Sequence, residues 1–243
     1  MLKELPKIVQ GPEQFAEMPE EYRELLLRQM SVHAEGELSG ADDYALLLYP
    51  IAPNSYEKKV CLDRSVEELD HYQKAADILA DLNVDASHML EQKLGERSLY
   101  ATEAVQHINT WPERGLFAFL GEGAVVTILE EWLEHSYLPV REMAPSVLAE
   151  ERMHQAHGFR IVREYSRDPE GKNEVQKALN KWWAISLDLF GPSNSRKSPV
   201  LVKYGLRKKT NEQARQDYMK RMAPRLEELG FTIPDEKEGR KFI

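Results

Sequence analysis

The sequence EELDH at residues 67–71 recurs in related form, EERMH, at residues 150–154. Each stretch holds a glutamate followed three residues later by a histidine, and these pairs are Glu68 with His71 and Glu151 with His154. On a helix, side chains three residues apart lie on the same face. Each glutamate can therefore point into the same cavity as its histidine.

A single glutamate precedes each pair by about the length of one helix. Glu37 lies 31 residues before Glu68, and Glu122 lies 29 residues before Glu151. These separations suit two hairpins of antiparallel helices that face one another. A glutamate from each of two helices and a Glu-x-x-His pair from each of the other two form the ligand set of di-iron or di-manganese sites in ferritin-like bundles. The predicted ligands are Glu37, Glu68, His71, Glu122, Glu151 and His154.

Other glutamates compete with these ligands within each helix. Glu35 competes with Glu37, while Glu67 and Glu150 are less favoured than their neighbours because only Glu68 and Glu151 precede a histidine by three residues. On the third helix the competitors are Glu130, Glu131 and Glu134. Glu122 is favoured there because small and apolar residues flank it, and an acid buried among them without a partner would cost several kcal/mol.

The helical signals extend over most of the 243 residues. They predict an all-α fold, a ferritin-like four-helix bundle with additional C-terminal helices, in a single domain over residues 1–243. The bundle core is expected at about 19–165 and the C-terminal helices at about 173–230. Individual helices are predicted at 19–48, 56–82, 115–144 with a kink at Pro139, 145–165 with Pro145 in the first turn, 173–190, and 211–229 with an interruption at Pro224. Residues 83–114 are expected to be irregular with short helices, and residues 191–199 to be a polar loop.

Composition narrows the class of protein. A net charge of −9 argues against general nucleic-acid binding, and no apolar run reaches the length of a membrane span. The single cysteine, Cys61, excludes a disulfide framework and is expected to pack inside the second helix. The N-terminus lacks a signal-peptide core, so the expected location is the cytoplasm.

The predicted ligands also suggest the chemistry. Four carboxylates carry a charge of −4, which two ferrous ions neutralise, and carboxylate oxygen with imidazole nitrogen suits iron or manganese. Two ferrous ions can together deliver two electrons to O2. Ferroxidases, radical-forming reductase subunits and manganese catalases use the same ligands, so the metal site alone leaves the reaction open.

Further segments carry a resemblance to a known family that runs from about Pro19 to Pro234. They are YRELLLRQMSVHAEGE at 22–37, EELDH at 67–71, EERMHQAHGF at 150–159, WW at 182–183, FGP at 190–192 and LGFTIP at 229–234. In order and spacing they resemble the catalytic subunits of bacterial phenylacetyl-CoA epoxygenases, also called ring 1,2-phenylacetyl-CoA epoxidases.

The resemblance implies a mono-oxygenase that adds one atom of O2 to the aromatic ring of an acyl-CoA thioester, most simply phenylacetyl-CoA. Two iron ions, or manganese, would be its cofactors, and electrons would come from NAD(P)H through a separate iron-sulfur flavin reductase. An oligomeric complex with a ferritin-like companion subunit is implied as well. Carried over by position, the six predicted ligands are the catalytic, metal-binding residues.

Two departures from the family's pattern affect these expectations. The family has aspartate where this chain has Glu122, and the longer side chain could alter metal coordination. The chain also ends soon after residues 229–234, so a partner-binding or lid element of the family is expected to be absent.

The resemblance and a basic cluster together predict a binding site for CoA. Positions matching Arg28, Arg64 and Asn211 contact CoA in the resembling subunits. Arg207 and Lys208 belong to a basic cluster near Asn211, which could bind phosphates or simply be solvated. Trp182 and Trp183 are expected in the core rather than at the substrate.

Two further interpretations stay open at this point. The first is a di-metal oxidase, ferroxidase or catalase that uses no CoA. The second is a non-catalytic ferritin-like scaffold subunit, for which an incomplete ligand set would be evidence; here all six ligand types are present.

Overall fold

The computed structural model describes residues 6–97 and 102–243. Apart from turns and loops these residues are helical, with a single isolated bridge between Val9 and Tyr137. The long helices are Glu20–Asp42 (α2), Ser55–Asp81 (α4), Trp111–Trp132 (α7), Leu138–Tyr165 (α8), Pro169–Asp188 (α9) and Asn211–Glu227 (α11). The short elements are Pro12–Ala16 (α1), the π-helical Asp43–Leu48 (η1), Tyr49–Ile51 (α3), His88–Glu91 (α5), the 3-10 turn Leu94–Glu96 (η2), Thr102–Val105 (α6) and Lys197–Lys203 (α10).

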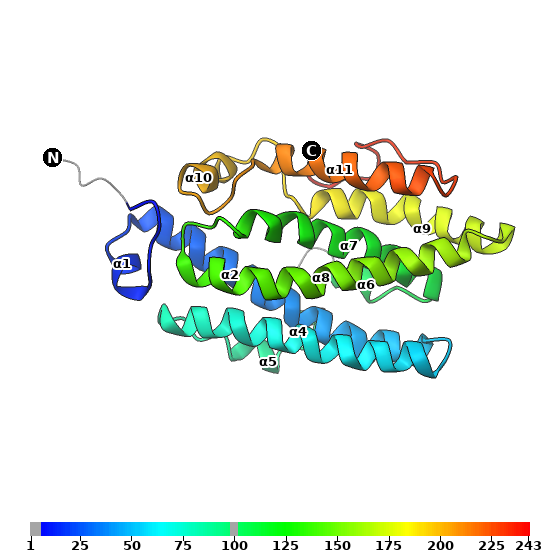
Figure 1. Ribbon diagram of the computed structural model, residues 1–243, viewed down its shortest axis with the longest axis horizontal. Helices are drawn as coiled ribbons and strands as arrows, with labels where there is room; N and C mark the ends of the chain where they lie inside the picture. Colours follow the sequence, from blue (N-terminus) through cyan, green and yellow to red (C-terminus); the bar gives the residue numbers. More distant parts are fainter. Residues whose placement is uncertain (1–5, 98–101) are drawn as a thin grey trace.

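Two helical hairpins build a ferritin-like four-helix bundle. Helix α2 packs chiefly on α4, and α7 packs chiefly on α8. Helices α9 and α11 pack on α7, and Figure 1 shows them along the side of the bundle away from α4. The all-α prediction with additional C-terminal helices is therefore confirmed.

Close packing of α7 on α8 depends on Gly158. A Cβ atom added there would lie 2.4 Å from the backbone nitrogen of Phe119, which a flexible side chain could not relieve. The indole rings of Trp182 and Trp183 are fully buried in the core between α7, α9 and α11, as predicted. Cys61 is a buried free thiol on α4, also as predicted.

The predicted boundary between the third and fourth helices, at residues 144–145, is wrong. Helix α7 ends at Trp132, because the backbone N–H of Ser136 donates to the carbonyl of Gly205 at 2.9 Å and its carbonyl accepts from Val9 N–H at 2.7 Å. Pro139 then stands in the first turn of α8, where a missing N–H costs nothing. Pro145 lies inside α8, so tertiary packing overrides the local preference for a helix start.

The other helix boundaries differ less from the predicted ones. The first predicted helix, 19–48, corresponds to α2 followed by a π-helical segment, and the second corresponds closely to α4. Helix α9 begins earlier than predicted because the Asp168 side chain caps the N–H of Gly171 at 2.8 Å. Helix α11 continues through Pro224 without interruption, and α10 replaces part of the expected polar loop. Of the segment 83–114, residues 98–101 lie outside the described residues.

In residues 6–97 and 102–243, no helix combines the length and the apolar character that crossing a membrane requires.

A buried histidine gives the fold a predicted dependence on pH. His135 is fully buried and accepts a hydrogen bond on Nδ1 from Tyr137 N–H at 3.0 Å. Burial, assisted by the charge of Arg141, lowers the pKa of His135 from 6.5 to about 3. The unfolded chain takes up this proton below pH 6.5 and the folded chain does not. Stability present above pH 6.5 is therefore lost as the pH falls toward 3, by about 2 kcal/mol at pH 5.

The measurement is urea unfolding of the wild type and of His135→Gln at pH 7 and pH 5. The wild type should lose about 2 kcal/mol more than the variant between these pH values. Equal losses in both proteins would show that His135 does not carry the effect.

Candidate metal centre

Six side chains from four helices converge in the middle of the bundle. Each of α2 and α7 contributes one glutamate, and each of α4 and α8 contributes a Glu-x-x-His pair. Their oxygen and nitrogen atoms form two groups, within each of which the atoms lie within 4.8 Å of one another. The first group is Glu37, Glu68, His71 and Glu151, and the second is Glu68, Glu122 and His154. The structure thus brings together all six predicted ligands, and Glu68 belongs to both groups.

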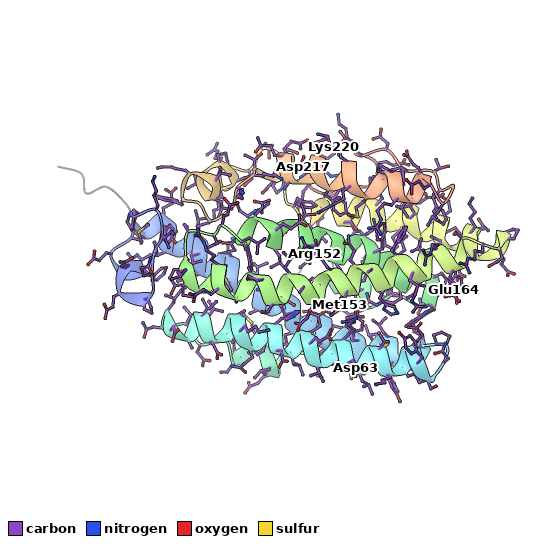
Figure 2. The ribbon with its side chains drawn as sticks, viewed as in Figure 1. Asp63, Arg152, Met153, Glu164, Asp217 and Lys220 are labelled. Atoms are coloured by element: carbon purple, nitrogen blue, oxygen red, sulfur yellow. The ribbon has the colours of Figure 1, made fainter. Side chains whose placement is uncertain are left out.

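The inner and outer faces of α8 differ sharply at this site. Glu151 and His154 are almost completely buried, whereas Arg152 and Met153 project outward, as Figure 2 shows. A glycine on the facing helix makes space for the shared carboxylate. A Cβ atom added to Gly40 of α2 would lie 3.0 Å from the Glu68 carboxyl group. The three-residue spacing and one small neighbour therefore account for the local arrangement.

Glu67 and Glu150, the rival ligand candidates of the sequence, contact the two histidines from outside the cluster. Nε2 of His71 lies 2.6 Å from Glu150 Oε2, and Nε2 of His154 lies 2.7 Å from Glu67 Oε2. Each hairpin thus supplies the outer carboxylate for the histidine of the other. A carboxylate that accepts from Nε2–H leaves the Nδ1 lone pair free to face a metal.

The Nδ1 atoms face carboxylate oxygens inside the cluster. His71 Nδ1 lies 3.1 Å from Glu37 Oε2, and His154 Nδ1 lies 3.1 Å from Glu68 Oε1. In the described structure, His154 Nδ1 and Glu151 Oε2 are buried without a hydrogen-bond partner. Two buried acceptors left without a donor are what a cluster that could bind cations would show before binding them.

Electrostatics support the same conclusion. Burial and the charges of Glu151 and Glu37 raise the pKa of Glu68 well above its ordinary value. Burial and the charge of Glu151 raise the pKa of Glu122 to about 8. The carboxylates are therefore too crowded to be ionised together unless positive charge is added. Two divalent cations would neutralise four carboxylates, and this buried Glu/His cluster could bind metal.

The remaining candidate glutamates of the third helix have other partners. Glu130 accepts from Arg152 and Arg221, Glu131 accepts from Arg207, and Glu134 pairs with Lys208. These acids form ion pairs outside the cluster, which leaves Glu122 as the α7 residue within it.

A cavity of about 670 Å³ adjoins the cluster. Four of the six cluster residues line it, namely Glu37, Glu68, Glu122 and Glu151. Most of its wall is apolar, from α2, α7, the end of α9 and α10. Such a cavity can hold an apolar group beside the cluster and keep water away from it.

The predicted CoA residues divide into two sets. Arg28, Arg207 and Asn211 line this cavity, and Arg28 is exposed, so it stands where the cavity opens. Arg64 and Lys208 are not among the lining residues; Arg64 donates to Glu67 and Lys208 donates to Glu134 at 2.5 Å. Arg207 already makes a double hydrogen bond to Glu131, at 2.8 and 3.0 Å.

Sequence reasoning assigned no role to several other lining residues. His33 lies one turn before Glu37, and its Nδ1 is 2.8 Å from Glu37 Oε1. Burial would raise the pKa of Glu37, but the charge and hydrogen bonds of His33 and His71 hold it well below its ordinary value. Tyr44 also lines the cavity, as does Lys197, which belongs to the basic cluster near Asn211. His33 and Tyr44 share the helical face of Glu37, and that spacing is the signal by which they could be found.

Comparisons with known proteins agree with this geometry. A family model described as phenylacetic acid catabolic protein matches residues 10–242. The chain is 26% identical over 221 residues to the subunit designated A of the 1,2-phenylacetyl-CoA epoxidase of Escherichia coli (strain K12). That match covers 90% of this chain and 71% of the relative.

Proposed function

The chain belongs to the phenylacetic acid catabolic protein family, and from this premise we propose that it is the catalytic subunit of a multicomponent di-iron mono-oxygenase. The proposed reaction is epoxidation of the aromatic ring of an acyl-CoA thioester, with phenylacetyl-CoA as the simplest substrate. The observation that carries the proposal is the complete set of six ligand-type side chains, four of which line an apolar cavity. A scaffold subunit would not need that set.

Two ferrous ions, or manganese ions, held by Glu37, Glu68, His71, Glu122, Glu151 and His154 would supply the electrons that activate O2. The protein's own contribution is to hold the ligands in place. Glu68 belongs to both ligand groups, and Glu67 and Glu150 fix the orientation of the histidine rings. The apolar wall holds the acyl ring near the cluster and excludes water.

The proposed substrate follows the length of the cavity. Arg28 lies nine residues before Glu37 on α2, about 14 Å along the helix axis. A CoA diphosphate at the exposed end would therefore leave its pantetheine arm to reach inward to the cluster. Lys197 is the second exposed cation of the lining, and no ion pair with it is found in the described residues. Arg28 and Lys197 are the proposed phosphate contacts, with Arg207 and Asn211 beside them.

We further propose a ferritin-like companion subunit, an iron-sulfur flavin reductase that passes on electrons from NAD(P)H, and a cytoplasmic location. Helix α4 exposes Leu62, Val66 and Leu69 at helical spacing, with 48%, 59% and 43% of their surfaces accessible. Apolar side chains exposed on one face are typical of surfaces that protein partners cover. The cytoplasmic proposal is supported by the use of CoA thioesters.

Removing Arg28 should weaken the binding of phenylacetyl-CoA about tenfold, because one charge-assisted contact to phosphate is lost. Wild-type affinity should also fall as salt is raised. The measurement is isothermal titration of the Fe(II)-loaded chain with its companion, without O2. Lys208→Ala is the control, since Lys208 is also a basic residue predicted from the sequence to bind CoA but lies outside the cavity. It should bind within about threefold of the wild type.

Two outcomes would count against this account. If Arg28→Ala binds as tightly as Lys208→Ala, the phosphate contact is wrong. If neither CoA nor phenylacetyl-CoA binds the wild type, a di-metal oxidase becomes the better interpretation.

A further inference from the structure

Three polar side chains gather in the cavity near the Glu122 side of the cluster. Asp43 and Tyr44 begin the π-helical segment η1, and Arg114 lies in the first turn of α7, eight residues before Glu122. All three line the cavity, and each is only 3% exposed. Irregular π-helical turns occur frequently at functional sites.

Each of these side chains has a buried polar atom with no hydrogen-bond partner in the described structure. The atoms are Asp43 Oδ1, Tyr44 Oη and Arg114 Nη1. Arg114 Nη1 lies 3.8 Å from Asp43 Oδ2, which is too far for a hydrogen bond. The guanidinium lies 4.4 Å from the centre of the Tyr44 ring. Buried polar groups are normally satisfied, so orphaned atoms on three adjacent side chains point to a further polar group in this part of the cavity.

An aromatic wall stands next to these polar groups. The Phe117 ring lies 5.2 Å from the Arg114 guanidinium, and it also lines the cavity. Gly121 leaves space for that ring, since an added Cβ atom would lie 2.9 Å from it. This part of the cavity therefore presents an apolar wall for a ring and polar atoms at its edge.

We infer that Asp43, Tyr44 and Arg114 form a polar subsite for a hydroxyl group on the ring of the acyl substrate. A hydroxyl group can donate to Asp43 Oδ1 and, with its two lone pairs, accept from both Arg114 Nη1 and Tyr44 O–H, so one group can satisfy all three orphaned atoms. A methyl group of the same size satisfies none of them, and a carboxylate would be repelled by Asp43. The inference rests on the proposed acyl-CoA function and narrows its substrate to hydroxylated aryl-acetyl thioesters.

The test compares three CoA thioesters that differ only at the ring: phenylacetyl, 4-hydroxyphenylacetyl and 4-methylphenylacetyl. Their dissociation constants are measured by isothermal titration on the Fe(II)-loaded full chain, without O2. The hydroxyl compound should bind at least about tenfold more tightly than the methyl compound, because a site built for a hydroxyl leaves its own polar atoms unpaired against an isostere. The measurement is made at pH 8. Burial raises the pKa of Asp43 to about 6, so its carboxylate is charged at pH 8.

Tyr44→Phe should reduce the preference for hydroxyl over methyl to within about threefold. Its affinity for the methyl compound should not change, which shows that the cavity is intact. Tyr137→Phe is the matched control, because Tyr137 Oη is also buried without a partner but lies outside the cavity. It should keep the wild-type preference.

Equal affinities for the hydroxyl and methyl compounds in the wild type would overturn the inference. Water would then be the group that satisfies the orphaned atoms. An unchanged preference in Tyr44→Phe would overturn it as well. If no thioester binds, the proposed acyl-CoA function fails. The subsite is then tested by comparing the binding of p-cresol and p-xylene by ligand-observed NMR. Preference for p-cresol that Tyr44→Phe removes would support the subsite, and equal binding would overturn it.

Discussion

Replacing Glu68 with alanine should remove both metal ions from the protein. The wild-type chain is expected to bind about two iron or manganese ions, and Glu68 is the residue that both ligand groups share. Glu151→Ala should remove at least the ion of the group that also contains Glu37 and His71. The measurement is elemental analysis of metal per chain after loading with Fe(II) or Mn(II) and removal of the excess.

Glu67→Gln and Glu150→Gln are the matched controls for these losses. Both residues stand next to a ligand in sequence but reach the histidines only at the outer nitrogens, and Glu67 also accepts from Arg64. They should retain two metal ions per chain, with affinity lower by about tenfold to a hundredfold in competition with a chelator. Circular dichroism of each metal-free variant checks that the fold is kept. An unchanged metal content in both Glu68→Ala and Glu151→Ala would rule out the site.

The repeat of Glu-x-x-His units made most of the bundle predictable. Helical spacing determines which side chains share a face, so two pairs and two earlier glutamates were enough to predict two facing hairpins. The same reasoning could not place the end of α7. That end depends on backbone hydrogen bonds from Ser136 to Gly205 and Val9, which are far away in the sequence. The single domain over residues 1–243 stays a prediction.

The surroundings of the site were less predictable than its ligands. Glu67 and Glu150 were considered only as rival ligands, because their contacts cross from one hairpin to the other. Arg64 is basic and close to Glu68 in sequence, yet helix rotation turns it to Glu67 instead of the cavity. The orphaned atoms of Tyr44 and Arg114 can be recognised only after packing excludes every other partner.

The isolated chain should complete at most a single turnover, because each further turnover needs electrons from outside the chain. The proposed ferrous pair would give up two electrons in each cycle and would have to be reduced again. The chain has one cysteine, Cys61, which is buried, so it cannot form an iron-sulfur cluster of its own. It also lacks a Gly-x-Gly-x-x-Gly fingerprint for a dinucleotide. We therefore expect the electrons for further cycles to come from another protein.

The decisive experiment counts product molecules per chain by mass spectrometry. Chemically reduced chain, loaded with Fe(II) and an aromatic acyl-CoA, should form no more than one oxygenated product on exposure to O2. Adding NAD(P)H with an iron-sulfur flavin reductase and the companion subunit should make product formation continuous. Glu68→Ala in the complete mixture is the control and should form no product, because both ligand groups lose their shared carboxylate. Continuous NAD(P)H-dependent product from the purified chain alone would contradict the prediction, since the chain itself would then have to act as the reductase.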